Sequence, residues 1–344
     1  MPDFPINAQP HPRGWFAGIE WLRAVFITFV VAMHLNLAQI LAGKVPHFLE
    51  KSTGFDLLLF DVFTSAVPGF LLISIFLQAT KPQDAGRTRQ HLRGVFFLYA
   101  FWVGSWVLLT RSRPEPTTWG VIRFALQGGG WAFYFFALLL LLHLQQVAIW
   151  KWSDRGLCLG FLGSTLLVIA GFSVMACNYH AWTRIDTYWW PICFMAIPFA
   201  GNWLGRHHED LLGDPRRFRL WLFSFFGLAL ASALVEWSFA ADAAELVMRP
   251  FLPEYLRLSP LFTALALILL ALKVRSVPRC VGFLARNSLG IFCLHTFVLG
   301  RLYGEINKRV PDPAIAGGLT LIVVLILGAW ITELVRKVLA SRLI

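Results

Sequence analysis

The feature that most constrains this chain is a series of long, nearly uninterrupted apolar blocks joined by short polar connections. A helix needs about 20 mostly apolar residues to cross the hydrocarbon core of a bilayer. Such blocks, or slightly shorter ones, lie at residues 19–41, 55–79, 94–110, 131–150, 157–177, 187–204, 219–240, 258–273, 280–300 and 314–335. We therefore predict an all-α, polytopic integral membrane protein with about ten transmembrane helices. The third, sixth and eighth blocks are short, so the pattern allows a count that differs by one or two.

Composition agrees with a membrane protein and argues against a nucleic-acid partner. Hydrophobic residues make up 57% of the chain and charged residues 14%, too few charges for the surface of a soluble domain of this size. The net charge is +11, but the basic residues sit in short loops between apolar blocks and form no single stripe. The cysteines are odd in number and no CxxC occurs, so neither a disulfide framework nor a zinc framework is expected.

The loop charges predict an orientation. With the N-terminus inside, the inner connections carry the larger share of Lys and Arg, most clearly in the tight loop with Lys81, Arg87, Arg89 and Arg93. Both termini are therefore expected to be cytoplasmic. We expect one transmembrane domain over residues 1–344, with a polar segment at 1–18, no cleaved signal peptide and no appended soluble domain.

The first apolar block carries three ionisable residues, Glu20, Arg23 and His34. Charged groups inside membrane helices are costly unless they are paired or hydrated, so each is a functional candidate. Arg23 and His34 are eleven positions apart, which places them on one stripe of a helix with a rise of about 16 Å between them. Glu20, one turn before Arg23, is positioned to orient it. An arginine at the inner mouth suits an anion such as phosphate, and a deeper histidine suits proton transfer or nucleophilic chemistry.

The alternative is that His34 packs between helices while Arg23 extends to the interface. The shared stripe favours a common function.

At this point the residues resemble the membrane acyltransferase-3 family, whose first helix carries Arg, ten intervening residues and then His, as Arg23 and His34 do. Residues 67–74, ending at Ser74, resemble the Phe-rich stretch of its second helix, and residues 131–142, from Trp131, resemble its Trp-Phe-Leu-Tyr block. Residues 287–295, ending at His295, resemble its late Ser-x-Gly-Ile-Tyr-x-x-His stretch.

Arg89 and Arg93 resemble the basic cluster before the family's third helix. Two departures are visible. Glu20 stands where many members have Asp, and Ile75 replaces the glycine after the serine, which puts a close backbone approach there in doubt.

The resemblance implies an enzyme of the bacterial inner membrane that transfers an acyl group, usually acetyl, from cytoplasmic acyl-CoA to a hydroxyl of a sugar or glycan. The acyl-CoA is a co-substrate, and no permanently bound cofactor is expected. Arg23, Arg89 and Arg93 would hold the CoA phosphates. His34 would act as general base toward the acceptor; carrying the acyl group itself is the less favoured role.

Further polar residues are weaker candidates. Substrate binding is assigned to His295, Glu236, Trp131 and Ser74, although a helix–helix hydrogen bond would equally explain His295, and an interfacial position would explain Glu236. His143 is interpreted as a packing residue. Arg286 either joins the CoA-binding cluster or extends to the interface.

No metal site is predicted, because His207 and His208, beside Glu209 and Asp210, lack a third spaced ligand. Two other classes of function remain open. A transporter or glycan flippase would also bury charges at mid-membrane, but no matching halves with broken helices are evident. A sensor or scaffold would need no histidine at position 34. The acceptor, the acyl chain (acetyl or succinyl) and the oligomeric state cannot be deduced from the sequence.

Overall fold

The computed structural model describes residues 16–37, 54–81, 84–129, 133–177, 188–247 and 255–343. Every regular element in these ranges is helical. In chain order the elements are α1 (Ala17–His34), α4 (Gly54–Thr64), α5 (Ala66–Ala79), α6 (Ala85–Thr110), α7 (Thr118–Leu126), α8 (Tyr134–Ile149), α9 (Asp154–Cys177), the 3₁₀ helix η1 (Pro191–Phe194), α11 (Ala196–Gly213), α12 (Pro215–Val247), α13 (Ser259–Leu272), α14 (Arg279–Arg309) and α15 (Pro313–Leu343).

Each predicted apolar block contains one or two of these helices, which confirms the all-helical class. Within the described ranges, seven helical segments are long and apolar enough to cross a membrane. Two shorter apolar helices, α8 and α13, add to them. The chain is therefore a multi-pass membrane protein.

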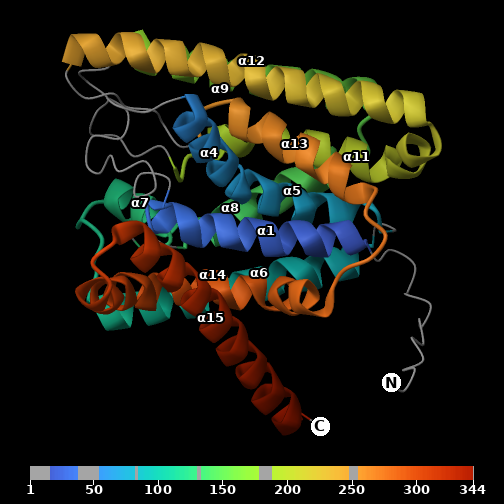
Figure 1. The fold of residues 1–344 in the computed structure, drawn as a ribbon. Helices are drawn as coiled ribbons and strands as arrows, with labels where there is room; N and C mark the ends of the chain where they lie inside the picture. Colours follow the sequence, from blue (N-terminus) through green and yellow to red (C-terminus); the bar gives the residue numbers. More distant parts are fainter. Residues whose placement is uncertain are drawn as a thin grey trace, which may run out of the picture.

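α1 runs through the middle of the helical bundle (Figure 1). It packs against α4, α5, α13, α14 and α15. α12 lies along one side of the bundle, and the C-terminal part of α15 projects from the other (Figure 1). The helix with the functional candidates Arg23 and His34 is thus a central one.

α1 ends sooner than its apolar block predicts. The block extends to residue 41, but the helix ends at His34. Asn36 has a left-handed backbone with φ 53°, a conformation that terminates helices and that asparagine tolerates better than most residues. His34 therefore lies at the end of α1, and residues 38–41 are outside the described part.

Glycines set three close helix contacts. A methyl group at Gly18 would lie 1.7 Å from the carbonyl oxygen of Ala271, so α1 and α13 touch backbone to backbone there. Gly201 and Gly205, four residues apart on α11, face Ile75 and Ala79 of α5. This spacing of small residues is typical of tight packing between membrane helices. At position 75, where the family glycine is absent, the isoleucine side chain packs against Gly201 of the facing helix.

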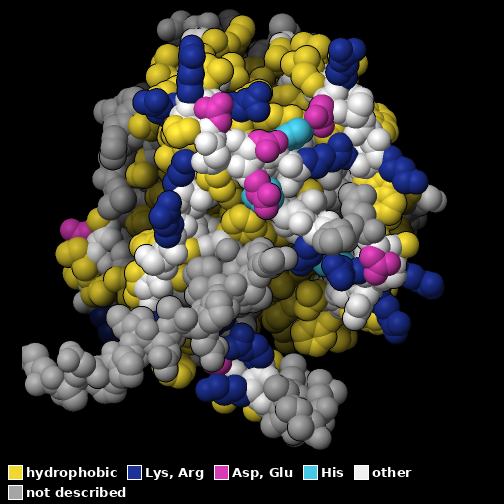
Figure 2. Space-filling model, turned by 90° about the vertical axis from the view of Figure 1, so that its right-hand side faces the viewer, with side chains coloured by type: hydrophobic (Ala, Val, Ile, Leu, Met, Phe, Trp, Pro, Cys, Tyr) yellow, Lys and Arg dark blue, Asp and Glu magenta, His cyan; other side chains and the backbone are white. Residues whose placement is uncertain are grey.

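Charged side chains gather at one end of the bundle. Figure 2 views the end at which α1 begins and the connection between α13 and α14 lies. Lys, Arg, Asp, Glu and His side chains are spread over this face between hydrophobic ones (Figure 2). His207, bonded to Asp154 at 2.9 Å, belongs to α11, which ends on this side (Figure 1). A polar end of this kind is expected where a helical bundle leaves the bilayer.

Candidate active site

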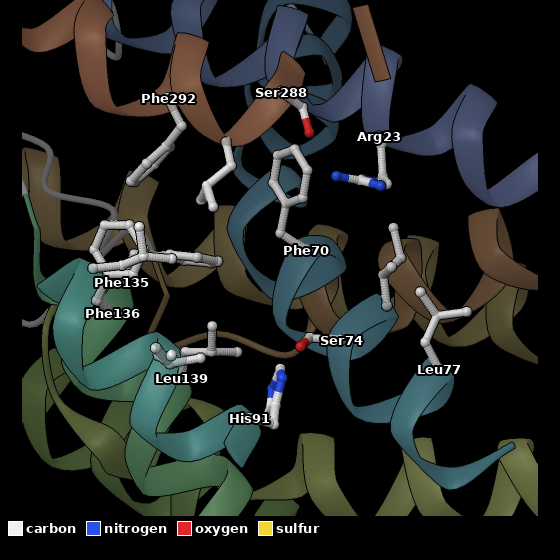
Figure 3. Close-up of a pocket in the computed structure, with 15 residues that line it drawn as sticks. Arg23, Phe70, Ser74, Leu77, His91, Phe135, Phe136, Leu139, Ser288 and Phe292 are labelled. Carbon is white, nitrogen blue, oxygen red and sulfur yellow. The ribbon is translucent and has the colours of Figure 1, made fainter. Parts of the chain in front are cut away.

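A cavity of about 450 Å³ lies between α1, α5, α6, α8 and α14. Its polar lining residues are Arg23, Ser74, His91 and Ser288. Its remaining walls are apolar and are formed by Phe70, Ile73, Leu77, Gly94, Val95, Leu98, Phe135, Phe136, Leu139, Leu289 and Phe292. Arg23 and Ser288 point into this space from one side, and Ser74 and His91 approach it from another (Figure 3). The cavity has the size and the mostly apolar lining of a small-molecule site.

Arg23 reaches this cavity from the first half of α1. Glu20 lies one turn earlier, beside the contact of α1 with Gly282 of α14. A methyl group at Gly282 would lie 3.3 Å from Glu20 Oε2 and 3.4 Å from Arg286 Nη1. The glycine therefore leaves room for a carboxylate and a second guanidinium one turn from Arg23. Arg286 lies on the Glu20 side of α14 and does not line the cavity.

At the other end of α1, His34 meets His295 of α14. The two imidazole ring centroids are 5.0 Å apart, and the rings are inclined by 40°. His295 is 1% exposed, and its Nδ1 lies 2.6 Å from the carbonyl oxygen of Phe292. Because a carbonyl only accepts, Nδ1 must carry the proton, which leaves the lone pair of Nε2 as an acceptor. This Nε2 has no hydrogen-bond partner among the described residues.

Phe292 lies next to both the Arg23 cavity and the His34–His295 pair. Its ring lines the Arg23 cavity and lies 5.7 Å from the His295 ring, centroid to centroid. It also contacts the rings of Phe135 at 5.1 Å and Phe136 at 6.2 Å. Since neither histidine lines the cavity, the Phe292 side chain stands between the cavity and the His34–His295 pair.

The other predicted residues lie elsewhere. Arg89 and Arg93 are exposed on α6 and outside the cavity lining, and the Arg93 guanidinium lies 5.4 Å from the centroid of the Phe97 ring. Trp131 falls outside the described residues. The described part contains no group of three His, Cys, Asp or Glu side chains suited to a metal ion.

Glu236 belongs to a separate buried cluster that fixes the start of α13. Its Oε1 accepts hydrogen bonds from the backbone N–H groups of Leu258 at 2.7 Å and Ser259 at 3.2 Å, and its Oε2 accepts from Ser259 Oγ at 2.5 Å. Arg257 Nη1 lies 3.8 Å from Oε2 and also bonds to Asp61. These contacts provide the capping that a buried helix start requires.

Sequence reasoning missed one polar group beside the cavity. His143, interpreted as a packing residue, bonds to Ser74, and His91, which no motif singled out, bonds to His143. A signal was available in part, because His143 and Gln146 are one helical turn apart within an apolar block. The partners on other helices could not be deduced from spacing.

Comparison with known proteins agrees with the resemblance seen in the sequence. A family model described as an acyltransferase domain, that of the acyltransferase-3 family, matches residues 16–334. Searches of curated proteins and of solved structures gave no match. Because the family match covers most of the chain, including α1, the Arg23 cavity and the His34–His295 pair, the protein belongs to the membrane acyltransferase-3 family and is an acyltransferase.

Proposed function

We propose that this protein is an acyl-CoA-dependent O-acyltransferase of the bacterial inner membrane. It moves an acyl group, acetyl in the first instance, from cytoplasmic acyl-CoA to a hydroxyl of a cell-surface or lipid-linked glycan. The observation that carries the proposal is the relation between the Arg23 cavity and the His34–His295 pair. The Phe292 side chain lines the cavity and contacts the His295 ring.

The orientation follows from charge. The end at which α1 begins is rich in Lys and Arg, and short loops rich in these residues stay in the cytoplasm. Ten crossings with both termini inside would put the Arg23 end of α1 on the cytoplasmic side, where acyl-CoA is available. The guanidinium would bind a phosphate of CoA, and the pantetheine arm would extend along the cavity to Phe292, whose side chain would have to turn aside for the thioester to meet His34.

In the chemical step, His34 acts as the general base and His295 orients the acceptor. His34 removes the proton of the acceptor hydroxyl as its oxygen attacks the thioester carbonyl carbon. The tetrahedral intermediate then expels the thiolate, and the proton returns to sulfur, so the products are an O-acyl ester and free CoA thiol. His295, whose Nδ1 donates to the Phe292 carbonyl, can accept through Nε2 from a neighbouring hydroxyl of the glycan and so orient the acceptor. General-base catalysis of this kind contributes about 100- to 10,000-fold in rate.

The test uses inverted membrane vesicles supplied with radiolabelled acetyl-CoA. Label should appear in a glycan fraction with the native protein. It should fall by about 100-fold or more in His34→Ala and strongly in Arg23→Ala, at equal protein content. His207→Ala is the matched histidine control, because His207 bonds to Asp154 outside the cavity. Full glycan acylation in His34→Ala would exclude the base assignment, and glycan movement without covalent label would identify a transporter.

A further inference from the structure

A hydrogen-bonded polar network adjoins the Arg23 cavity. Ser74 of α5 and His91 of α6 line the cavity, while His143 and Gln146 of α8 and Asn202 of α11 lie behind them. His143, Gln146 and Asn202 are 2%, 3% and 0% exposed, respectively. Polar groups this deep among apolar helices are costly, so a functional reason is expected for keeping them.

The protons of this network can be assigned from Gln146. Its Nε2 lies 3.0 Å from the carbonyl oxygen of Ile75 and 3.2 Å from Asn202 Oδ1, two groups that only accept. Both amide hydrogens are therefore used, and Gln146 Oε1 must accept from His143 Nδ1 at 3.1 Å. In the neutral imidazole, Nδ1 then carries the hydrogen and Nε2 is an acceptor.

Ser74 Oγ lies 3.0 Å from this acceptor, His143 Nε2. The hydroxyl hydrogen thus points to His143, and the lone pairs of Oγ are left for the cavity. His91 Nε2 approaches the same nitrogen at 3.1 Å and competes for it. Figure 3 shows Ser74 and His91 facing each other at the cavity wall. When Ser74 holds the His143 nitrogen, its hydroxyl hydrogen points to His143 and its oxygen can accept a hydrogen bond from a bound ligand.

The rest of the cavity restricts the ligand. The apolar walls favour a slender and mostly apolar chain; they include Phe70, Leu77, Leu98 and Leu139. Ser74 adds an acceptor part-way along the wall, and Arg23 adds a positive charge. The pantetheine arm of acyl-CoA has this chemistry, because it is largely aliphatic, carries two amide N–H groups and continues into phosphates.

We infer that Ser74, oriented by His143 and Gln146, accepts a hydrogen bond from a pantetheine amide N–H of the acyl donor. The inference rests on the proposed function and refines it. It assigns Ser74 to donor binding, and it makes His143 and Gln146 positioning residues that act through Ser74.

The experiment compares donors with and without these amides, using the full-length protein in membrane vesicles. Acetyl-CoA carries both amides, and ethyl thioacetate carries none. Ser74→Ala should lower kcat/KM for acetyl-CoA by about tenfold, the effect of roughly one hydrogen bond, mainly through KM. With ethyl thioacetate the same substitution should have no effect. Ser288→Ala, which removes another hydroxyl from the same cavity, is the matched control and should give a loss that does not depend on the donor.

Positioning by His143 is tested by non-additivity. His143→Gln should raise KM for acetyl-CoA, and the Ser74→Ala/His143→Gln double variant should be no worse than Ser74→Ala alone. Equal losses with both donors in Ser74→Ala would make the network merely structural and overturn the inference. Recovery of an acetyl ester on the Ser74 peptide after denaturation would also overturn it, because Ser74 would then be a nucleophile. Absence of acyl transfer by the native protein with either donor would instead refute the proposed function.

Discussion

The imidazole rings of His34 and His295 lie 5.0 Å apart, although they come from the first helix and from one of the last. The Nδ1 of His295 is held by the Phe292 carbonyl, and its Nε2 lone pair is unused among the described residues. This arrangement makes the acceptor side of the proposed reaction depend on two histidines.

His295→Ala is expected to lower kcat by at least about tenfold, because about 1.4 kcal/mol of orienting hydrogen bond is lost in the transition state. KM for acyl-CoA should stay unchanged, since His295 does not line the Arg23 cavity. Steady-state kinetics on membranes with matched protein content measure both quantities. A rise in KM with an unchanged kcat would contradict an acceptor-side role.

Phe292→Ala is expected to connect the cavity with the His34–His295 pair and to admit water to the thioester. Exclusion of water is one way in which enzymes prevent hydrolysis of reactive groups. Hydrolysis of acyl-CoA without acceptor should therefore rise several-fold, and the double variant with His34→Ala should lose this rise. Thiol release with an indicator dye follows the reaction.

Phe135→Ala is the matched control for this prediction. Phe135 lines the same cavity and lies 5.1 Å from Phe292, but it has no ring contact with His295 among those described. Equal hydrolysis in both single variants would show that loosened packing, and not the loss of a barrier, admits water.

Glu236→Ala is expected to lower stability more than catalysis. The substitution removes the acceptors for two backbone N–H groups at the start of α13 and one of two carboxylates beside the buried Arg257 guanidinium. Breaking a buried ion pair costs about 3–5 kcal/mol. Thermal unfolding of the purified protein in detergent should show a clearly lower Tm. An unchanged Tm with reduced glycan acylation would instead favour the substrate-binding role assigned from the sequence.

Arg89→Ala and Arg93→Ala test the predicted CoA-phosphate cluster. Both side chains are exposed on α6, so any attraction they exert on CoA is screened by salt. If they contact the phosphates, each substitution raises KM for acetyl-CoA at low ionic strength, and the effect shrinks as salt is added. Arg23→Ala should raise KM at both ionic strengths, because its guanidinium lies in the cavity. Unchanged KM values for the α6 variants would limit the cluster to Arg23.

The helices could be predicted because the bilayer imposes a length on every apolar block. The same rule did not place the end of α1, because Asn36 breaks the helix locally within an apolar stretch. Arg23 and His34 could be selected because charge is costly inside a membrane helix, which one sequence reveals directly. His295 could be selected as a candidate, but its contact with His34 depends on how α1 and α14 pack.

The polar network around Ser74 could not be predicted from the sequence. Ser74, His91, His143 and Asn202 come from four helices, and no spacing in the sequence indicates that they meet. Glu236 shows the reverse problem, since a buried carboxylate that caps a helix has the same sequence signature as one that binds a substrate. Side-chain partners distinguish the two cases, and the sequence does not contain them.

The contact of Gly18 with the Ala271 backbone ties the beginning of α1 to α13 without any space between them. A larger residue at position 18 would push the beginning of α1 away from α13 and tilt the helix that carries both Arg23 and His34. The alignment of the guanidinium and the imidazole with their partners thus depends on a buried glycine in the first turn of α1.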